Sequence, residues 1–366
     1  MQFIKPGINI NFTGNRVKAY ALSLILIIIS LASLLIHGGP NYGIDFAGGM
    51  LIQVKFTQDV PVEKIRSGLN KVGLKNTSVQ SFGEDGSEFL IKSSNTEMGE
   101  DNLSQAVTDA LKTSTASLPE IRRIEMVGPQ VGQDLRTQAL LAIFYSLLFI
   151  TIYISGRFEM KWVLSGVIAG ALMSSVYFLS IFKVGIPFLI TAALIITLVL
   201  FWYMNLKYAI GAVVSLIHDV TITVGVFSVL NLEFSLQIVA ALLTIIGYSL
   251  NDTIIVYDRI RENITKSNKL PLETIINKSI NETLSRTVLT SGTTLVALLA
   301  LFFLGGEIIH NFAFAMIFGI VVGTYSSIFV ASPILLLSNI KPIKLSQPEA
   351  VPFKVAGKKI NTIKSK

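Results

Sequence analysis

An aspartate interrupts one of the longest apolar stretches of this sequence. Asn251 and Asp252 lie between the runs LLTIIGYSL and TIIVY. A carboxylate at such a place in hydrocarbon costs about 2.5–3.5 kcal/mol even on the mildest insertion scale. Asp252 therefore needs an ionic partner, a path to water or a proton. The pattern favours a proton-titratable site that faces other helices over the alternative, a helix end from which Asp252 reaches water.

Arg286 is a second ionisable residue, and it stands near the start of the apolar run 284–304. If this run and the one around 235–257 form antiparallel neighbouring helices, Arg286 and Asp252 lie near the same membrane face and form an ion pair. Such a pair keeps a carboxylate ionised until the two groups separate. We therefore predict a proton pathway that includes Asn251, Asp252 and Arg286.

His218 and Asp219 stand in the middle of another apolar run. They follow Lys207 by about 12 residues, or roughly 18 Å along an α-helix. Because ionisable residues at membrane depth mark functional sites, we expect Asp219, together with His218, to join a hydrated relay with Asp252 and Arg286. The alternative is that the pair only hydrogen-bonds to neighbouring helices and positions them.

Hydroxyl and small residues accompany these charges, in TVLTSGTT (287–294) and GIVVGTYSS (319–327). Small residues let membrane helices approach closely, and they equally leave room for water beside a charge. We assign Tyr248 and Thr287 either to the proton pathway or to helix packing. An intramembrane hydrolase is a rival class, but it requires a Ser–His or paired-Asp site, and its oxyanion and substrate-gate features are not identifiable.

The composition indicates that membrane helices position these residues. Half of the chain (51%) is hydrophobic and only 14% is charged, whereas soluble domains carry about 25% charged residues. The chain has no cysteine, which excludes disulfides and thiolate metal sites or nucleophiles. Its three histidines are scattered, so no metal cluster is indicated. We expect no cofactor, no metal and no enzymatic activity.

Eight apolar runs are long enough to cross about 30 Å of hydrocarbon as helices. They are residues 19–36, 139–155, 162–182, 187–203, 208–230, 234–257, 284–304 and 312–337. The fold class is therefore an α-helical polytopic membrane protein with about eight transmembrane helices. Lysine and arginine concentrate in the connections on one side, and the positive-inside rule then places both termini in the cytoplasm.

The segment 38–136 is the one sizeable polar part of the chain. Its pattern predicts the order β-α-β-β-α-β, which is typical of a ferredoxin-like sandwich, on the extracytoplasmic side. The expected organisation adds a cytoplasmic N-terminus with the first transmembrane helix (1–37), a transmembrane bundle (137–338) and a basic cytoplasmic tail (339–366). This topology explains the formal net charge of +7 without a nucleic-acid partner.

Several long stretches together match one known family. They are YGIDFAGGMLIQV (42–54), VGPQVGQDLRTQAL (127–140), AIGAVVSLIHDVTITVG (209–225), the run 232–263 that contains GYSLNDTIIVYDRIREN, LSRTVLTSGTT (284–294) and FAFAMIFGIVVGTYSSIFVASP (312–333). Over most of its length the chain resembles the SecD/SecF family of protein-export membrane proteins, in its SecF branch.

The resemblance implies a pseudo-symmetric bundle with SecD, of the RND superfamily, in the bacterial inner (plasma) membrane. It implies that the proton-motive force assists protein translocation, with the SecYEG translocon, YajC and unfolded exported protein as further partners. Carried over by position, Asp252 of GYSLND and Arg286 of LSRT become proton-pathway residues, with Asp219 of IHD beside them. The outer family motif falls on Gly43, Asp45, Gly48, Gly49, Gly128 and Pro129.

The chain departs from the family pattern at about 160–205, where two spans are added between RFE (157–159) and the IHD helix. The added segment resembles a degenerate copy of the segment immediately C-terminal to it, so we predict a duplicated or inserted hairpin. Ala47 and Met160 are minor departures. Two alternative functions stay open, half of an RND-type small-molecule exporter and a purely structural stabiliser of the translocon. A complete exporter carries two membrane halves, whereas this chain has one.

Overall fold

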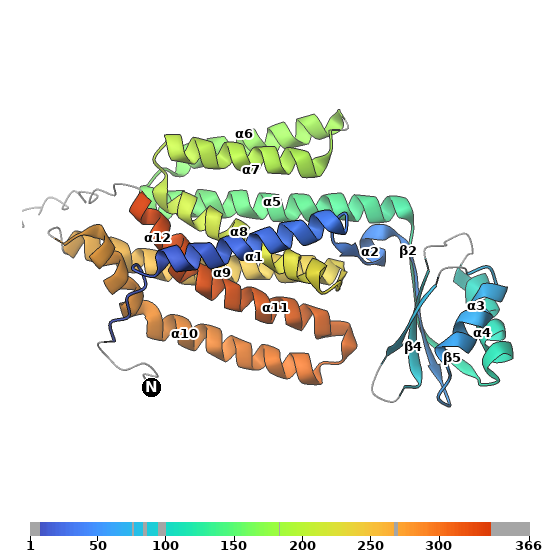
Figure 1. The fold of residues 1–366 in the computed structure, drawn as a ribbon. Helices are drawn as coiled ribbons and strands as arrows, with labels where there is room; N and C mark the ends of the chain where they lie inside the picture. Colours follow the sequence, from blue (N-terminus) through green and yellow to red (C-terminus); the bar gives the residue numbers. More distant parts are fainter. Residues whose placement is uncertain are drawn as a thin grey trace, which may run out of the picture.

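The computed structural model describes residues 8–74, 77–82, 86–93, 100–182, 184–266 and 270–337. A bundle of long helices makes up most of it, and a small sheet domain lies at one end of the bundle (Figure 1). Within the described residues, eight helices are long and apolar enough to cross a membrane. The eight predicted spans are therefore confirmed by length and composition. The predicted basic tail lies outside the described residues.

The spanning helices follow the apolar runs and in several cases continue beyond them. They are α1 (Arg16–Ile36), α5 (Pro129–Glu159), α6 (Trp162–Ile181), α7 (Ile186–Tyr203), α8 (Lys207–Val229), α9 (Leu236–Lys266), α10 (Leu272–Leu304) and α11 (Glu307–Ser326) with its continuation. Helix α8 is the most enclosed, because α1, α5, α9 and α11 all pack against it. The polar side chains of α8 therefore need partners on these neighbours.

Helix α11 runs into a π-helical turn, η1 (Ser327–Ala331), followed by α12 (Ser332–Ile334) and η2 (Leu335–Leu337). Pro333 has no N–H for the usual bond to the carbonyl four residues earlier. Side chains bind two carbonyls of the turn instead, since Ser332 Oγ donates to Ser327 O at 2.7 Å and Tyr257 Oη donates to Ala331 O at 3.0 Å. Such single π-turns are frequent at functional sites.

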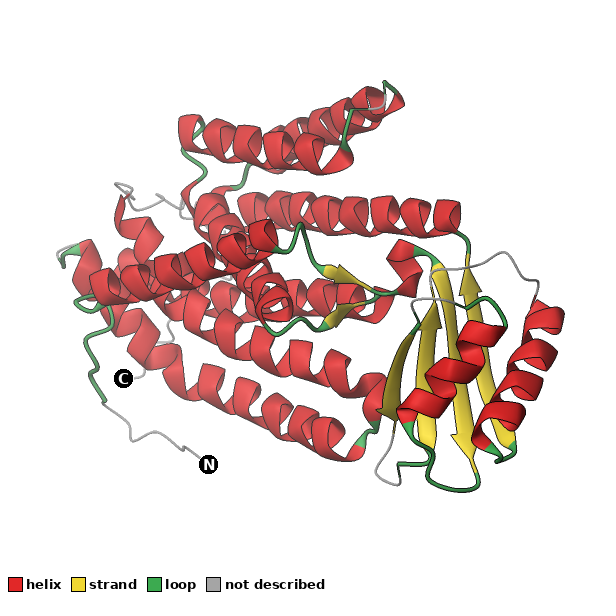
Figure 2. Ribbon diagram, turned by 45° about the vertical axis from the view of Figure 1, so that its right-hand side comes forward, coloured by secondary structure: helices red, strands yellow, loops and turns green. Residues whose placement is uncertain are grey.

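The sheet domain contains β2 (Gly49–Phe56), α3 (Val62–Lys71), β3 (Ser78–Phe82), β4 (Glu88–Ser93), α4 (Glu100–Thr115) and β5 (Pro119–Val127). Its four strands are ordered β3-β4-β2-β5, and all neighbours are antiparallel. Both helices cover the same face of the sheet (Figure 2). Alternate residues of β2, from Met50 to Phe56, are buried on that face, as the period of a strand requires.

A short junction joins this domain to the bundle. Residues of β1 (Asn41–Tyr42) pair in parallel with β6 (Glu233–Phe234), the connection between α8 and α9. The one-turn helix α2 (Ile44–Ala47) follows β1 and packs against α5. Neither α2 nor the pairing of β1 with β6 was predicted from the sequence, because each is too short to leave a periodic signal.

The outer family motif supplies the special backbone of this junction. Gly48 has a φ of +73°, and a Cβ there would lie 2.9 Å from the Cα of Pro129, so only glycine fits. Asp45 Oδ2 accepts the backbone N–H of Leu236 at 2.8 Å, at the first residue of α9. Gly43 and Gly128 precede the first residues of α2 and α5, and Gly49 has a φ of +129°.

The predicted extra hairpin is present as α6 and α7. Helix α6 packs on the outer side of α5, and α7 packs on α5 and α8, away from α9, α10 and α11 (Figure 1). In each of the two helices, only 22% of the residues of the most apolar stretch are buried within the structure. The hairpin therefore contributes none of the polar side chains described below.

Candidate functional site

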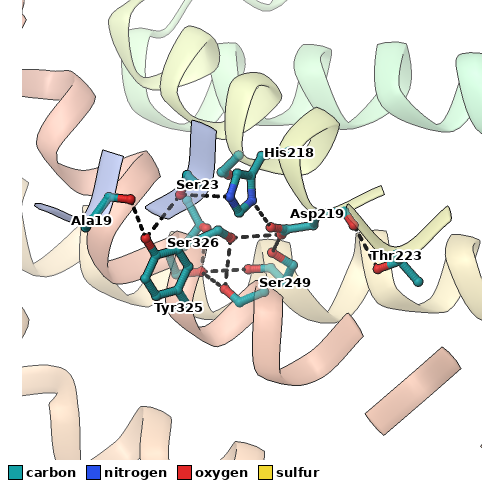
Figure 3. Close-up of polar contacts among 12 residues, drawn as sticks. Ala19, Ser23, His218, Asp219, Thr223, Ser249, Tyr325 and Ser326 are labelled. Carbon is teal, nitrogen blue, oxygen red and sulfur yellow. Dashed lines mark hydrogen bonds and ion pairs between the residues drawn. The ribbon is translucent and has the colours of Figure 1, made fainter. Parts of the chain in front are cut away.

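Asp219 lies at the centre of a buried polar cluster. Its side chain is 1% exposed. Oδ2 accepts hydrogen bonds from Ser249 Oγ at 2.6 Å and Ser326 Oγ at 2.8 Å, while Oδ1 lies 2.8 Å from His218 Nδ1 (Figure 3). These partners come from α9, α11 and α8 itself. Both carboxylate oxygens are thus bonded, which fixes three helices relative to one another.

A row of contacts continues from His218 to α1. His218 Nε2 lies 3.0 Å from Ser23 Oγ, which lies 3.1 Å from Tyr325 Oη, and Tyr325 Oη donates to Ala19 O at 2.7 Å (Figure 3). Each hydroxyl carries one proton. Because Tyr325 donates its proton to Ala19 O, Ser23 donates to Tyr325 and His218 Nε2 donates to Ser23. This row of contacts therefore joins α8 to α1 and α11.

Asp252 is as buried as Asp219, at 1% exposed, but it is less well bonded. Oδ2 accepts from Ser291 Oγ of α10 at 3.2 Å. Oδ1 has no hydrogen-bond partner among the described residues, and the same is true of the buried hydroxyl of Thr287. Thr287 is one helical turn before Ser291, on the same face of α10. Ser291 Oγ also lies 2.8 Å from Thr324 Oγ1 of α11.

The predicted ion pair between Asp252 and Arg286 is wrong as a direct contact, although Arg286 is close enough for its charge to act on the carboxylate. The salt bridges of the described residues do not include it, and Arg286 is exposed. The helices are neighbours as expected. The reason is rotational, because Arg286 precedes Ser291 by five residues and lies about 140° away from it around α10. Ser291, not Arg286, faces the carboxylate.

The structure separates the other predicted pathway residues. Asn251 is exposed on α9, pointing away from the cluster that holds Asp252. Tyr248 Oη donates to Thr290 O at 2.9 Å and lies 3.0 Å from Thr294 Oγ1, so it joins α9 to α10. The hydrogen bonds recorded for the described residues join neither Asp219 nor His218 directly to Asp252.

Four consecutive residues of α11 and its continuation connect the two carboxylates indirectly. Thr324 contacts Ser291 of α10, Tyr325 contacts α1 through Ser23, and Ser326 donates to Asp219 of α8. Ser327 Oγ lies 2.9 Å from Thr253 Oγ1 of α9. Successive helical residues are about 100° apart, so each of the four reaches a different helix. The sequence signal was the stretch 319–327, which was interpreted only as packing or as room for water.

The site shows no sign of a metal centre. Within the described ranges, no group of three or more His, Cys, Asp or Glu side chains could hold an ion.

Comparisons with known proteins place the chain in a family. The family described as "Protein export membrane protein SecD/SecF, C-terminal" matches residues 106–187 and 179–341, and the "SecD/SecF GG Motif" family matches residues 33–60. A protein translocase subunit SecF from Magnetococcus marinus is 44% identical over 345 residues, which cover 93% of this chain and 95% of the relative. A subunit of the same name from Vibrio alginolyticus is 39% identical over 348 residues, covering 95% and 96%.

A solved structure agrees with this result. The crystal structure of SecDF, a translocon-associated membrane protein from Thermus thermophilus, matches with a TM-score of 0.65 and 32% identity. The match covers 90% of this chain and 39% of the SecDF chain, so the present chain spans about two fifths of that protein. The chain belongs to the SecD/SecF family of protein-export membrane proteins and is a multi-pass membrane protein.

Proposed function

We propose that this member of the SecD/SecF family is a SecF-type subunit of the Sec protein-export machinery, which acts with SecD and uses the proton-motive force to assist translocation. Relatives with the SecF name are matched over nearly their whole length. The observation that carries the energy-coupling part is Asp252, a buried carboxylate with one unbonded oxygen beside the unbonded hydroxyl of Thr287. We propose no enzymatic reaction.

The surroundings of Asp252 are costly for a charged side chain. A buried carboxylate without a direct ion-pair partner is expensive as an ion, and an unpaired buried oxygen requires an explanation. A proton taken up at Oδ1 removes the charge, and a state in which Arg286 turns toward Asp252 restores it. The proton-motive force supplies about 2.3 kcal/mol per charge per 100 mV, enough to bias two such states.

The second half of the bundle is proposed to come from SecD. The SecDF chain is more than twice as long as the part of it that this chain matches. In addition, only 17% of the residues in the most apolar stretch of α10 are buried here, which leaves most of this helix free to contact another subunit. We place SecD on the face of α9 and α10 that exposes Asn251 and Arg286. SecYEG, YajC and unfolded exported protein are the further proposed partners.

Substitution of Asp252 by asparagine tests the proposal. Asp252→Asn keeps the side-chain shape but cannot exchange a proton, so inverted membrane vesicles should lose the gradient-dependent part of protein export while insertion and partner binding remain. Asp258→Asn is the matched control, because Asp258 is on the same helix in an exposed pair with Arg157, and such pairs are worth about 1 kcal/mol or less. Full gradient-dependent export by Asp252→Asn vesicles would contradict the proposal.

A purely structural function is the second candidate, and Asp219 favours it. Both oxygens of Asp219 are bonded to groups that join helices, which is what a stabilising residue needs. If Asp252 has the same role, Asp252→Asn weakens the assembly with and without a gradient alike. The other alternative, half of a small-molecule exporter, differs in its substrate. Loss of small-molecule efflux by Asp252→Asn with normal protein export would favour it.

We also propose the orientation and domain boundaries expected from the sequence. The inner membrane holds the bundle (137–338), both termini are cytoplasmic, and the sheet domain (38–136) is an extracytoplasmic ferredoxin-like domain. Its separate hydrophobic core and strand order support this. A reporter fused after Phe182 should report an extracytoplasmic location, and the same reporter fused after Asn205 should report a cytoplasmic one. Activity on a single side for both would contradict a spanning α7.

The hairpin of α6 and α7 is proposed to be a duplicated segment. The C-terminal family model matches in two stretches that overlap at residues 179–187, which a repeat would produce. An added pair of spans leaves the orientation of everything downstream unchanged.

A further inference from the structure

An apolar cavity lies where the helix bundle meets the junction to the sheet domain. Its volume is about 180 Å³. Helix α5 contributes Ala139, Leu140 and Ile143, while α8 contributes Val220 and Val224. Side chains of α9, Phe46 of α2 and Phe234 of β6 close the remaining walls. None of the polar residues of the candidate site lines this cavity.

The walls of the cavity are apolar, and its rim is charged. Apolar cavities of about 150 Å³ stay dry and take up apolar molecules. At the rim, the guanidinium carbon of Arg136 lies 4.2 Å from the centre of the Tyr42 ring. Arg136 takes part in none of the salt bridges of the described residues and is exposed. A ligand that matches both features has an apolar chain and an anionic group.

We propose that this cavity is a phospholipid site, in which an acyl chain enters between α5 and α8 and the phosphate binds Arg136. The order of residues along α5 agrees with a lipid whose phosphate lies near the membrane surface and whose acyl chain points inward. Arg136 precedes Ala139 and Ile143 by one and two helical turns, so a chain that descends from the headgroup region passes the arginine first. Arginine and tyrosine at the end of an apolar helix are the usual residues of the membrane interface.

The bound lipid would also belong to the joint that holds the sheet domain. Phe46 and Phe234 line the cavity and pack against each other, with ring centres 6.1 Å apart. Their backbones belong to α2 and β6, which connect the domain to α8 and α9. An acyl chain that fills the cavity therefore supports these two rings from the membrane side. This inference does not depend on the proposed proton pathway.

Photocrosslinking in native membranes containing the full chain tests the site. The probe is phosphatidylglycerol with a diazirine in one acyl chain, and the comparison probe is diacylglycerol with the same chain. We expect phosphatidylglycerol adducts to concentrate on Leu140, Ile143 and Val224. Arg136→Gln should lower the yield of phosphatidylglycerol adducts about fivefold, because a charge-assisted contact is lost, and should leave diacylglycerol unchanged. Arg122→Gln, in the sheet domain, is the control.

Variants that fill the cavity give a second test of the proposed lipid site. Ala139→Leu places three more carbon atoms in the cavity and should abolish most adducts, whereas Ala142→Leu, the same change at an exposed position of α5, should not. Val220→Phe fills the cavity from α8 if Ala139→Leu does not accumulate. Equal adducts in the filled and control variants, equal labelling by both probes, or capture of polypeptide by a photoreactive residue at position 140 would each overturn the proposal.

Discussion

Asp219 and Asp252 are carboxylates of equal burial on adjacent helices, and they differ in how they are bonded. Asp219 has three partners, from α8, α9 and α11, at 2.6–2.8 Å. Asp252 has one, Ser291, at 3.2 Å, and its second oxygen has none among the described residues. Both aspartates lie within otherwise apolar runs, so hydropathy alone does not distinguish them.

We propose that this difference separates a positioning role for Asp219 from a titrating role for Asp252. A carboxylate whose oxygens all accept hydrogen bonds is stable where it is, and its neighbours lose their acceptor when it is removed. A half-bonded buried carboxylate is costly, and the proposed titrating role would account for its presence. Native proteins break the rules of polar satisfaction mainly at functional sites. The four residues Thr324–Ser327 touch both surroundings, which is how a change at one aspartate would reach the other.

The largest expected effect is on stability, and it falls on Asp219. Asp219→Ala should lower the free energy of unfolding by about 3–5 kcal/mol, because it removes three buried hydrogen bonds and leaves the His218 ring and two serine hydroxyls without their partner. Asp252→Ala should cost about 1 kcal/mol or less, since it removes one hydrogen bond and one unpaired oxygen together. Unfolding of the purified chain in mixed micelles by a denaturing detergent measures both. Equal losses would remove the distinction between the two sites.

The serine donors give a smaller effect in the same direction. Ser326→Ala removes a 2.8 Å bond to a carboxylate and should cost about 1.5–3 kcal/mol. Ser291→Ala removes a 3.2 Å bond and should cost about 0.5–1.5 kcal/mol. The same unfolding experiment applies, with Ser180→Ala as the control, because that half-buried serine donates only to a carbonyl of its own helix. A larger cost for Ser291→Ala would reverse the assignment.

The sequence predicted the helices and the two aspartates that they bury, but not the partners of these aspartates. Spans follow from local hydropathy, and a charge within such a run is visible directly. Partner choice depends on how each helix is rotated, which hydropathy does not record when a helix is apolar on all sides. Arg286 was therefore paired with Asp252 on the basis of depth alone, whereas a rotation of about 140° puts Ser291 there.

The hydroxyl residues were underestimated for the same reason. Ser249 and Ser326 are ordinary small residues in the sequence, and their importance appears only when α9 and α11 bring them to Asp219. The junction was missed because its elements, α2, β1 and β6, are two to four residues long. Glycines of the family motif, such as Gly48, were visible, but the strained backbone that requires them was not.

Thr287→Val has the smallest expected effect on stability and sharpens the comparison most. The hydroxyl of Thr287 is buried without a partner among the described residues, so its removal should stabilise the fold by about 1 kcal/mol. If that hydroxyl helps a proton reach Asp252, the same variant should lower gradient-dependent export in inverted vesicles, and Thr287→Ser should retain it. Thr293→Val is the matched control, since its exposed hydroxyl bonds only to carbonyls of its own helix. A more stable protein with weaker export would mean that the unpaired hydroxyl is kept for function. Unchanged export would limit the titrating site to Asp252 itself, and a loss of stability would show that Thr287 belongs to the packing, as the bonded groups around Asp219 do.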